Sequence, residues 1–111
     1  MSKMLSKQEL VVIQEFKARL LDRHASNVVA LKLFGSKARG DAHPESDVDL
    51  LIIVKERTAE FDDDTIDIVC DMIDEYGVYF ETVTMTEDSF QEAQDIQIPF
   101  AINILREAKT I

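Results

Sequence analysis

The fold of this chain is decided by Leu33-Phe34-Gly35-Ser36-Lys37-Ala38-Arg39-Gly40-Asp41 and, shortly after it, Ser46-Asp47-Val48-Asp49-Leu50-Leu51-Ile52. The apolar run 28–34 ends in a Gly-Ser turn, and after ten intervening residues two aspartates open the apolar run 48–54. Both runs have the composition of β-strands, and the second is nearly unbroken, which indicates a strand covered on at least one face. The turn after the first strand and the acids before the second can meet only if the two strands are antiparallel.

Asp47 and Asp49 are spaced to place two carboxylates side by side, because residues i and i+2 of a strand point to the same face. Two like charges this close repel each other and raise a pKa unless a cation lies between them. Such a pair predicts magnesium, which binds one or two carboxylates and completes its shell with water and phosphate oxygens. The alternative is an exposed pair of aspartates solvated by water, although two charges without a function are unusual directly before an apolar strand.

The Gly35-Ser36 turn ahead of a short helix offers free backbone N–H groups, which suit an anionic phosphate. Ser36 would hydrogen-bond a β- or γ-phosphate through its hydroxyl and its backbone N–H. Arg39 has a planar fork that fits phosphate and is the next candidate contact. Lys37 is either a further phosphate contact or a solvated surface residue, and Gly40 is expected to end the short helix.

The complete string resembles the signature of the DNA polymerase β superfamily of nucleotidyltransferases, which is Gly-Ser, a spacer and Asp-x-Asp. It is most similar to the minimal nucleotidyltransferases, in which Gly-Ser-x-Ala-Arg-Gly and Ser-Asp-x-Asp-Leu are typical. The resemblance implies an α+β, two-layer nucleotidyltransferase fold, with a small mixed sheet, antiparallel first two strands and helices packed mainly on one face. The matching residues are Gly35, Ser36, Ala38, Arg39, Gly40, Ser46, Asp47, Asp49 and Leu50.

The same resemblance implies a two-metal Mg²⁺ site held by Asp47, Asp49 and a third carboxylate that also accepts the proton of the attacking hydroxyl. The family usually supplies the third group as an Asp in a Val-Asp-Leu-Val-like strand. Here the corresponding strand is 78–84, and its only acid is Glu81. Glu81 is therefore the candidate for the metal and for the proton, unless it faces outward, in which case the domain would bind Mg-nucleotide and catalyse weakly.

Composition limits the class of protein. The 111 residues carry 12 Lys and Arg against 22 Asp and Glu, for a net charge of −10. An acidic chain without a basic stripe is a poor candidate for direct nucleic-acid binding. The chain lacks an apolar run of about 18 residues and a secretion leader, and the single Cys70 fits a reducing compartment, so we expect a cytoplasmic protein that is not inserted in a membrane.

The remaining elements follow from periodicity and capping signals. Ser6 and Glu9 form a capping box that opens a helix to about Arg23. A charged linker over 55–62 leads to a helix over 63–76, which Gly77 ends. A strand is predicted over 78–84, a helix from Thr86, and a final helix over 98–109 that begins near Pro99. The predicted inward positions of the two long helices are Leu10, Ile13, Phe16, Ala18, Leu20, Leu21, Ile66, Val69, Cys70, Ile73 and Tyr76.

Other candidate features have simpler interpretations. His24 and His43 lack metal-ligand spacing and are expected on the surface, with 43–45 as a loop. Acidic residues line the helix 63–76, either as a solvated face or as a docking surface for a basic partner. The final helix is expected to contribute to the core, with an interface as the alternative.

The resemblance also implies an activity. Such a domain would move a nucleoside monophosphate, with AMP from ATP as the first expectation, to an acceptor hydroxyl and release pyrophosphate. Larger relatives carry a second domain for the acceptor, whereas residues 1–111 are expected to form one minimal domain, so the acceptor site would come from another subunit or from the acceptor itself. Related minimal nucleotidyltransferases are commonly encoded beside small helical partners of the HEPN type, and some are antitoxins that adenylylate a tyrosine of that partner.

Two other classes of function stay open. A binding module would neutralise its partner by contact alone, with a vestigial nucleotide site. Modification of a small molecule is the third reading, weakened by the missing second domain. The base of the NTP and a homo-oligomeric state are also left open by the sequence.

Overall fold

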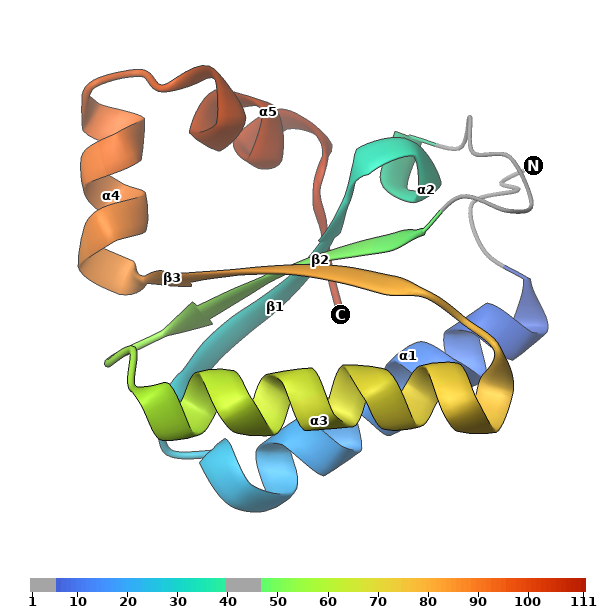
Figure 1. Cartoon of the computed structure of the whole chain (residues 1–111). Helices are drawn as coiled ribbons and strands as arrows, with labels where there is room; N and C mark the ends of the chain where they lie inside the picture. The colour runs from blue at the N-terminus through green and yellow to red at the C-terminus, as the bar shows by residue number, and fades with distance from the viewer. Residues whose placement is uncertain (1–5, 40–46) are drawn as a thin grey trace.

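The computed structural model describes residues 6–39 and 47–111, which form a mixed four-stranded sheet with helices on both faces (Figure 1). The strand order is β3-β2-β1-β4. β1 and β2 are antiparallel, as predicted, while β2 and β3 are parallel. The strands are β1 (Val28–Phe34), β2 (Val48–Val54), β3 (Phe80–Thr86) and β4 (Lys109–Thr110).

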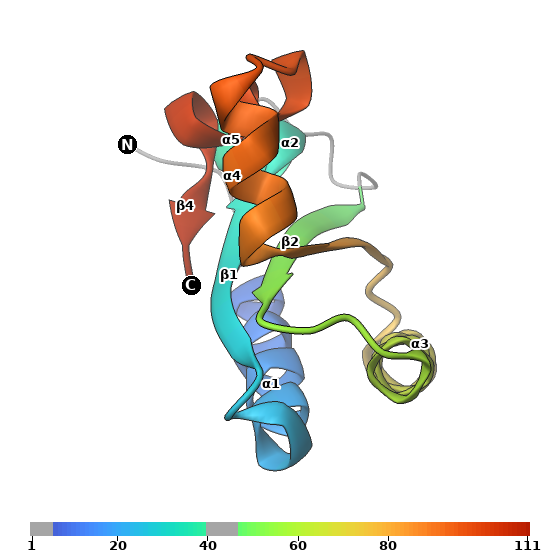
Figure 2. The same cartoon turned by 90° about the vertical axis from the view of Figure 1, so that its left-hand side faces the viewer.

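The two long helices share one face of the sheet, and two short helices cover part of the other (Figures 1 and 2). β2 separates the two cores by strand alternation: Leu50 and Ile52 pack with the long helices, while Leu51 and Ile53 pack with the short ones. The helices are α1 (Lys7–His24), α2 (Gly35–Arg39), α3 (Ala59–Tyr76), α4 (Glu87–Asp95) and α5 (Pro99–Glu107).

Local capping signals formed where they were predicted. The Ser6 hydroxyl accepts a hydrogen bond from the Glu9 backbone at 3.1 Å, and the Glu9 carboxylate accepts one from the Ser6 backbone at 2.9 Å. Thr86 caps α4, and Gly77 ends α3 in the left-handed conformation. These elements therefore begin and end on contacts between residues that are close in the sequence.

Three predicted boundaries were wrong. α3 begins at Ala59 and not at Asp63, because the Thr58 hydroxyl caps it by accepting from the Phe61 backbone at 3.0 Å. β3 lies two residues later than predicted, at 80–86, since it pairs with β2 over that range. α5 ends at Glu107, because Lys109 and Thr110 pair with β1 and extend the sheet.

Some predicted core positions were also wrong. Leu10 and Ala18 of α1 are exposed, whereas Val12 is fully buried. In α3 the predicted inward residues Ile66 and Cys70 are exposed. Packing of α3 is instead centred on the buried residues Phe61, Thr65 and Met72. Spacing of three to four residues is the same in both sets, so periodicity alone did not fix how far the helix is rotated.

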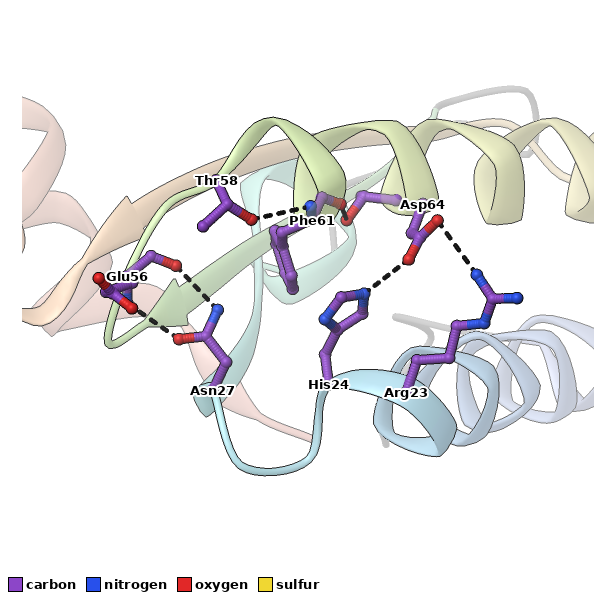
Figure 3. Close-up of polar contacts among 8 residues, drawn as sticks. Arg23, His24, Asn27, Glu56, Thr58, Phe61 and Asp64 are labelled. Atoms are coloured by element: carbon purple, nitrogen blue, oxygen red, sulfur yellow. Dashed lines mark hydrogen bonds and ion pairs between the residues drawn. The ribbon is translucent and has the colours of Figure 1, made fainter.

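The C-terminal end of α1 is tied to the start of α3 and to the β2–α3 connection (Figure 3). His24 hydrogen-bonds Asp64 at 2.8 Å and packs edge-on against Phe61, and its side chain is only 12% exposed. The prediction of a surface His24 was therefore wrong. Asn27 exchanges two hydrogen bonds with the backbone of Glu56, which joins the start of β1 to the end of β2.

Within the described part of the chain, no helix combines the length and apolarity needed to cross a membrane. The predictions for Gly40 as the end of the short helix, for His43, for the loop 43–45 and for the motif residue Ser46 lie outside the described residues.

Candidate active site

The candidate site lies where β1 ends and β2 begins, beside α2 (Figure 1). The antiparallel register places Phe34 opposite Asp49, so that Gly35, the next residue, starts α2 beside the aspartates. Asp49 alternates with Val48 and Leu50 of the long-helix core and therefore points to the face that carries α4 and α5. Asp47, two residues earlier, is exposed at the same edge. The strand pairing thus brings the two halves of the sequence motif together.

Glu81 lies directly opposite Asp49 in the parallel pair of β2 and β3. Val83 and Met85 follow Glu81 at strand spacing and pack in the same cluster as Leu51 and Ile53. Glu81 therefore lies on the same sheet face as the aspartates, on the strand next to them. The sequence had left open which way Glu81 faces, and the register of β3 answers that question.

Gly35 is in direct contact with the carboxylate of Asp49. Its φ of +75° lies in the left-handed region, and a Cβ atom added there would overlap Oδ2 of Asp49. The glycine is thus required twice, once for its backbone conformation and once for the close approach. Ser36 and the rest of α2 follow from this turn.

The electrostatics of the site centre on Asp49, whose pKa is raised to about 6. Partial burial is the main cause, followed by the hydrogen bond that Asp49 shares with Glu81 and by the negative charges of Glu81 and Asp47. Arg39 acts in the opposite direction and lowers the pKa of Asp49. Burial and crowded like charges both oppose ionisation, and a bound cation would relieve both effects.

These three carboxylates suit Mg²⁺ by their chemistry, because hard oxygen ligands of like charge are what this ion binds. As the side chains stand, residues 6–39 and 47–111 contain no cluster of three Asp, Glu, His or Cys side chains gathered as for a bound metal. Mutual repulsion of carboxylates disfavours such a cluster without a cation. The register nevertheless places Glu81 opposite Asp49, and the charges of Glu81 and Asp47 both contribute to the raised pKa of Asp49.

Lys37 has a different partner from the one predicted. Its ammonium donates to the carboxylate of Glu9 at 2.5 Å, and its side chain is only 3% exposed. The alternative of a solvated surface lysine is therefore wrong. Contact between Lys37 and phosphate stays a prediction, and it would require this ion pair to open. Burial raises the pKa of Glu9, but hydrogen bonds from Lys37 and from the Ser6 backbone outweigh it and lower the pKa overall.

Arg39 stands at the edge of the site. Its guanidinium forms an ion pair with Glu107 of α5 at 3.4 Å, and it also acts on Asp49 through its charge. The sequence pattern gave no indication of Glu107 or of the pairing between Glu9 and Lys37. Both partners are distant in the chain, and neither has a spacing that indicates a site.

A model of the nucleotidyltransferase domain family matches residues 13–109. A curated relative from Methanocaldococcus jannaschii, provisionally named a protein adenylyltransferase, is 32% identical over 99 residues. The aligned part covers 89% of this chain and 93% of the relative. The match therefore extends well beyond the short motif around the aspartates.

Solved structures are also similar to this chain. One, provisionally described as a minimal nucleotidyltransferase, has a TM-score of 0.58 at 26% identity and covers 92% of this chain and 94% of its own. Another is a toxin–antitoxin with AMP-PNP, with a TM-score of 0.57 at 14% identity and coverages of 87% and 70%. The second likeness concerns the fold alone.

Proposed function

This chain belongs to the nucleotidyltransferase domain family, and on that premise we propose that it transfers a nucleoside monophosphate from a Mg²⁺-bound NTP, with ATP as the expected donor, to a hydroxyl group. One observation carries the proposal: Asp47, Asp49 and Glu81 share one face of the sheet beside the Gly35 turn. Crowding acidic side chains at the start of an apolar strand lowers the stability of the fold, and such clusters are typical of functional sites such as a metal–phosphate site.

In this proposal each group has a defined role. Asp47, Asp49 and Glu81 hold magnesium, and Gly35 and Ser36 bind the triphosphate through backbone N–H groups and the Ser36 hydroxyl. Bound Mg²⁺ would neutralise charge on the phosphates. Arg39 is close enough to Asp49 to affect its pKa and would bind phosphate by exchanging its contact with Glu107.

The reaction is an in-line displacement. The acceptor oxygen forms a bond to the α-phosphorus while the bond from that phosphorus to the oxygen bridging to the β-phosphate breaks, and pyrophosphate leaves. The proton of the acceptor hydroxyl passes to the carboxylate of Glu81. Most of the catalytic effect comes from positioning and charge stabilisation, as in phosphoryl transfer generally.

For the acceptor we propose a tyrosine of a protein partner, a small helical protein of the HEPN type whose toxicity the modification would remove. The relative named as a protein adenylyltransferase supports a protein acceptor. The fold shared with a toxin–antitoxin structure is compatible with a partner of this kind.

The test is transfer of label from α-labelled ATP with Mg²⁺ into proteins of a host lysate. Wild type, Asp47→Asn and Asp49→Asn are compared, and Asp22→Asn on the exposed surface of α1 serves as the matched control. We expect one labelled protein band with wild type and with the control, and loss of that band with both site variants.

The rival function, neutralisation of a partner by contact alone, predicts a different result. Wild type would give no labelled band with any of the four NTPs, and the site variants would still bind the partner as tightly as wild type does. That combination, with folding confirmed by circular dichroism, would overturn the proposed activity.

A further inference from the structure

A hollow of about 240 Å³ lies between the start of α2 and one face of α5. Phe100, Asn103, Ile104 and Glu107 recur at helical spacing and line it from α5. Phe34, Gly35 and Arg39 line it from β1 and α2. Pockets that hold a whole drug-sized ligand usually measure about 300–1,000 Å³, so this hollow suits one part of a nucleotide.

The hollow adjoins the carboxylate site on a definite side. Gly35 lines it and also contacts Asp49, so the two spaces are neighbours. In the strand order β3-β2-β1-β4, Glu81 lies on the β3 side of the aspartates and the hollow on the β1 side. An in-line displacement places the acceptor and the leaving pyrophosphate on opposite sides of the α-phosphorus, so an acceptor beside Glu81 does not occupy the β1 side, where the hollow lies.

The chemistry of the lining fits a flat heterocycle. Phe34 and Phe100 meet edge to face with ring centroids 5.4 Å apart, and both residues line the hollow. The side-chain oxygen of Asn103 accepts a hydrogen bond from Arg106 at 2.6 Å, so its amide N–H₂ group is the part left to donate. Aromatic faces stack on bases, and an amide donor suits a ring nitrogen or a carbonyl oxygen.

We infer that this hollow receives the base of the nucleotide, with Phe100 as the stacking surface and Asn103 as a hydrogen-bond donor to the edge of the ring. The inference rests on the proposed function, since it names a subsite of the same nucleotide. The Arg39–Glu107 ion pair then stands between the base and the phosphates, where Arg39 can move from the Glu107 carboxylate to phosphate.

The experiment measures the dissociation constants of Mg-ATP and of Mg-tripolyphosphate, which has the phosphates and no base, by calorimetry on the whole chain. For Phe100→Ala we expect the dissociation constant for Mg-ATP to rise about five- to 150-fold, the range of base stacking on an aromatic side chain. For Asn103→Ala we expect a rise of about two- to tenfold. Tripolyphosphate should bind wild type and both variants equally.

Leu105→Ala is the matched control, because Leu105 is exposed on α5 and does not line the hollow. Since Phe100 also packs against the core, Asn103→Ala keeps the test valid if Phe100→Ala fails to fold. Two results would overturn the base subsite: unchanged binding of Mg-ATP by Asn103→Ala, or equal weakening of Mg-ATP and Mg-tripolyphosphate binding. If wild type still transfers label, the proposed function would stand in either case. A wild-type chain that binds neither ligand would overturn the proposed function as well.

Discussion

Gly35 can lie against the carboxylate of Asp49 because it has no Cβ atom. Any other residue would hold a left-handed backbone there at a cost of about 1–2 kcal/mol. Its Cβ would also displace the Asp49 carboxylate. Gly77 has nearly the same conformation, with φ +69°, but open space around the position of a Cβ. Substitutions at these two glycines therefore distinguish the effect of backbone strain from the effect of displacing Asp49.

We predict that Gly35→Ala lowers Tm by about 5–15 °C and reduces label transfer by more than about 100-fold, because misplacing a catalytic group by about 1 Å costs that much. Gly77→Ala should lower Tm by about 4–8 °C and keep transfer. Thermal unfolding and label transfer measure both effects. Equal loss of transfer in the two variants would argue that strain, and not the contact with Asp49, inactivates Gly35→Ala.

The raised pKa of Asp49 predicts that the stability of the metal-free chain depends on pH. Its pKa in the folded chain is raised to about 6, mainly by burial and then by Glu81. The folded state therefore binds this proton more tightly than the unfolded state does, and ionisation of Asp49 lowers stability as pH rises from about 4 to above 6. Asp49→Asn should raise Tm by about 1–4 °C above pH 6, after allowance for solvent screening.

Below about pH 4 that difference in Tm should vanish, because Asp49 is then protonated in both states. Millimolar Mg²⁺ should raise the Tm of wild type more than that of the variant. Tm measured over pH 3.5–8, with EDTA and with Mg²⁺, provides the check. A lower Tm for Asp49→Asn at neutral pH would mean that Asp49 is structural in the metal-free chain.

At the scale of elements, α2 has only five residues and depends on its anchors. Ala38 and Lys37 are its buried residues, and Lys37 connects it to Glu9 in the first turn of α1. Breaking a buried ion pair from one side leaves an uncompensated charge. This contact therefore holds the Gly35 turn and α2 against Glu9, which lies 28 residues before Lys37 in the chain.

We predict that Lys37→Met lowers the free energy of unfolding by about 2–3 kcal/mol, somewhat less than the roughly 3–5 kcal/mol for breaking a fully buried pair, because Glu9 stays partly exposed. The double variant Glu9→Gln/Lys37→Met should be less destabilised than Lys37→Met alone, since Gln can keep the capping contact with Ser6. Urea unfolding of each variant gives these values. Arg19→Met, at the more exposed pair with Glu75, is the control and should cost less than about 1 kcal/mol.

In activity, Lys37→Met should raise the KM for Mg-ATP more than it lowers kcat, because it loosens the Gly35 turn, the proposed phosphate contact, while the carboxylates stay in place. A double variant that is less stable than Lys37→Met would show that the two side chains do not act as a pair.

The whole molecule carries a net charge of −10 within extents of 34 × 31 × 17 Å. Electrostatic repulsion reaches about 30 Å at 0.01 M salt and about 3 Å at 1 M, so at low salt it acts across the entire chain. Surface ion pairs such as Arg19–Glu75 act against this repulsion, but each contributes little. We therefore expect net repulsion to dominate.

The prediction is that Tm of the metal-free chain rises by about 2–6 °C between 0.01 M and 1 M NaCl. Measuring Tm in NaCl and KCl with EDTA present excludes an effect of bound divalent ions. A fall in Tm over the same range would show that the ion pairs outweigh the repulsion.

Short-range patterns determined much of this protein. The bounds of β1 and β2, the capping box at Ser6 and the stop at Gly77 agree with the sequence, because each rests on residues within about one turn or one strand. The antiparallel pairing followed from the need for Gly35 and Asp49 to meet. The family followed from the same short string.

Only the tertiary structure decided the features that join distant residues. The register of β3 against β2 set the face of Glu81, and packing on Phe61 turned Cys70 outward and His24 inward. The ion pair between Lys37 and Glu9 and the hollow that α5 forms beside Gly35 also depend on tertiary packing. Periodicity states that a helix or strand has a buried side, but contacts with residues far along the chain select the side and the neighbours that each side chain meets.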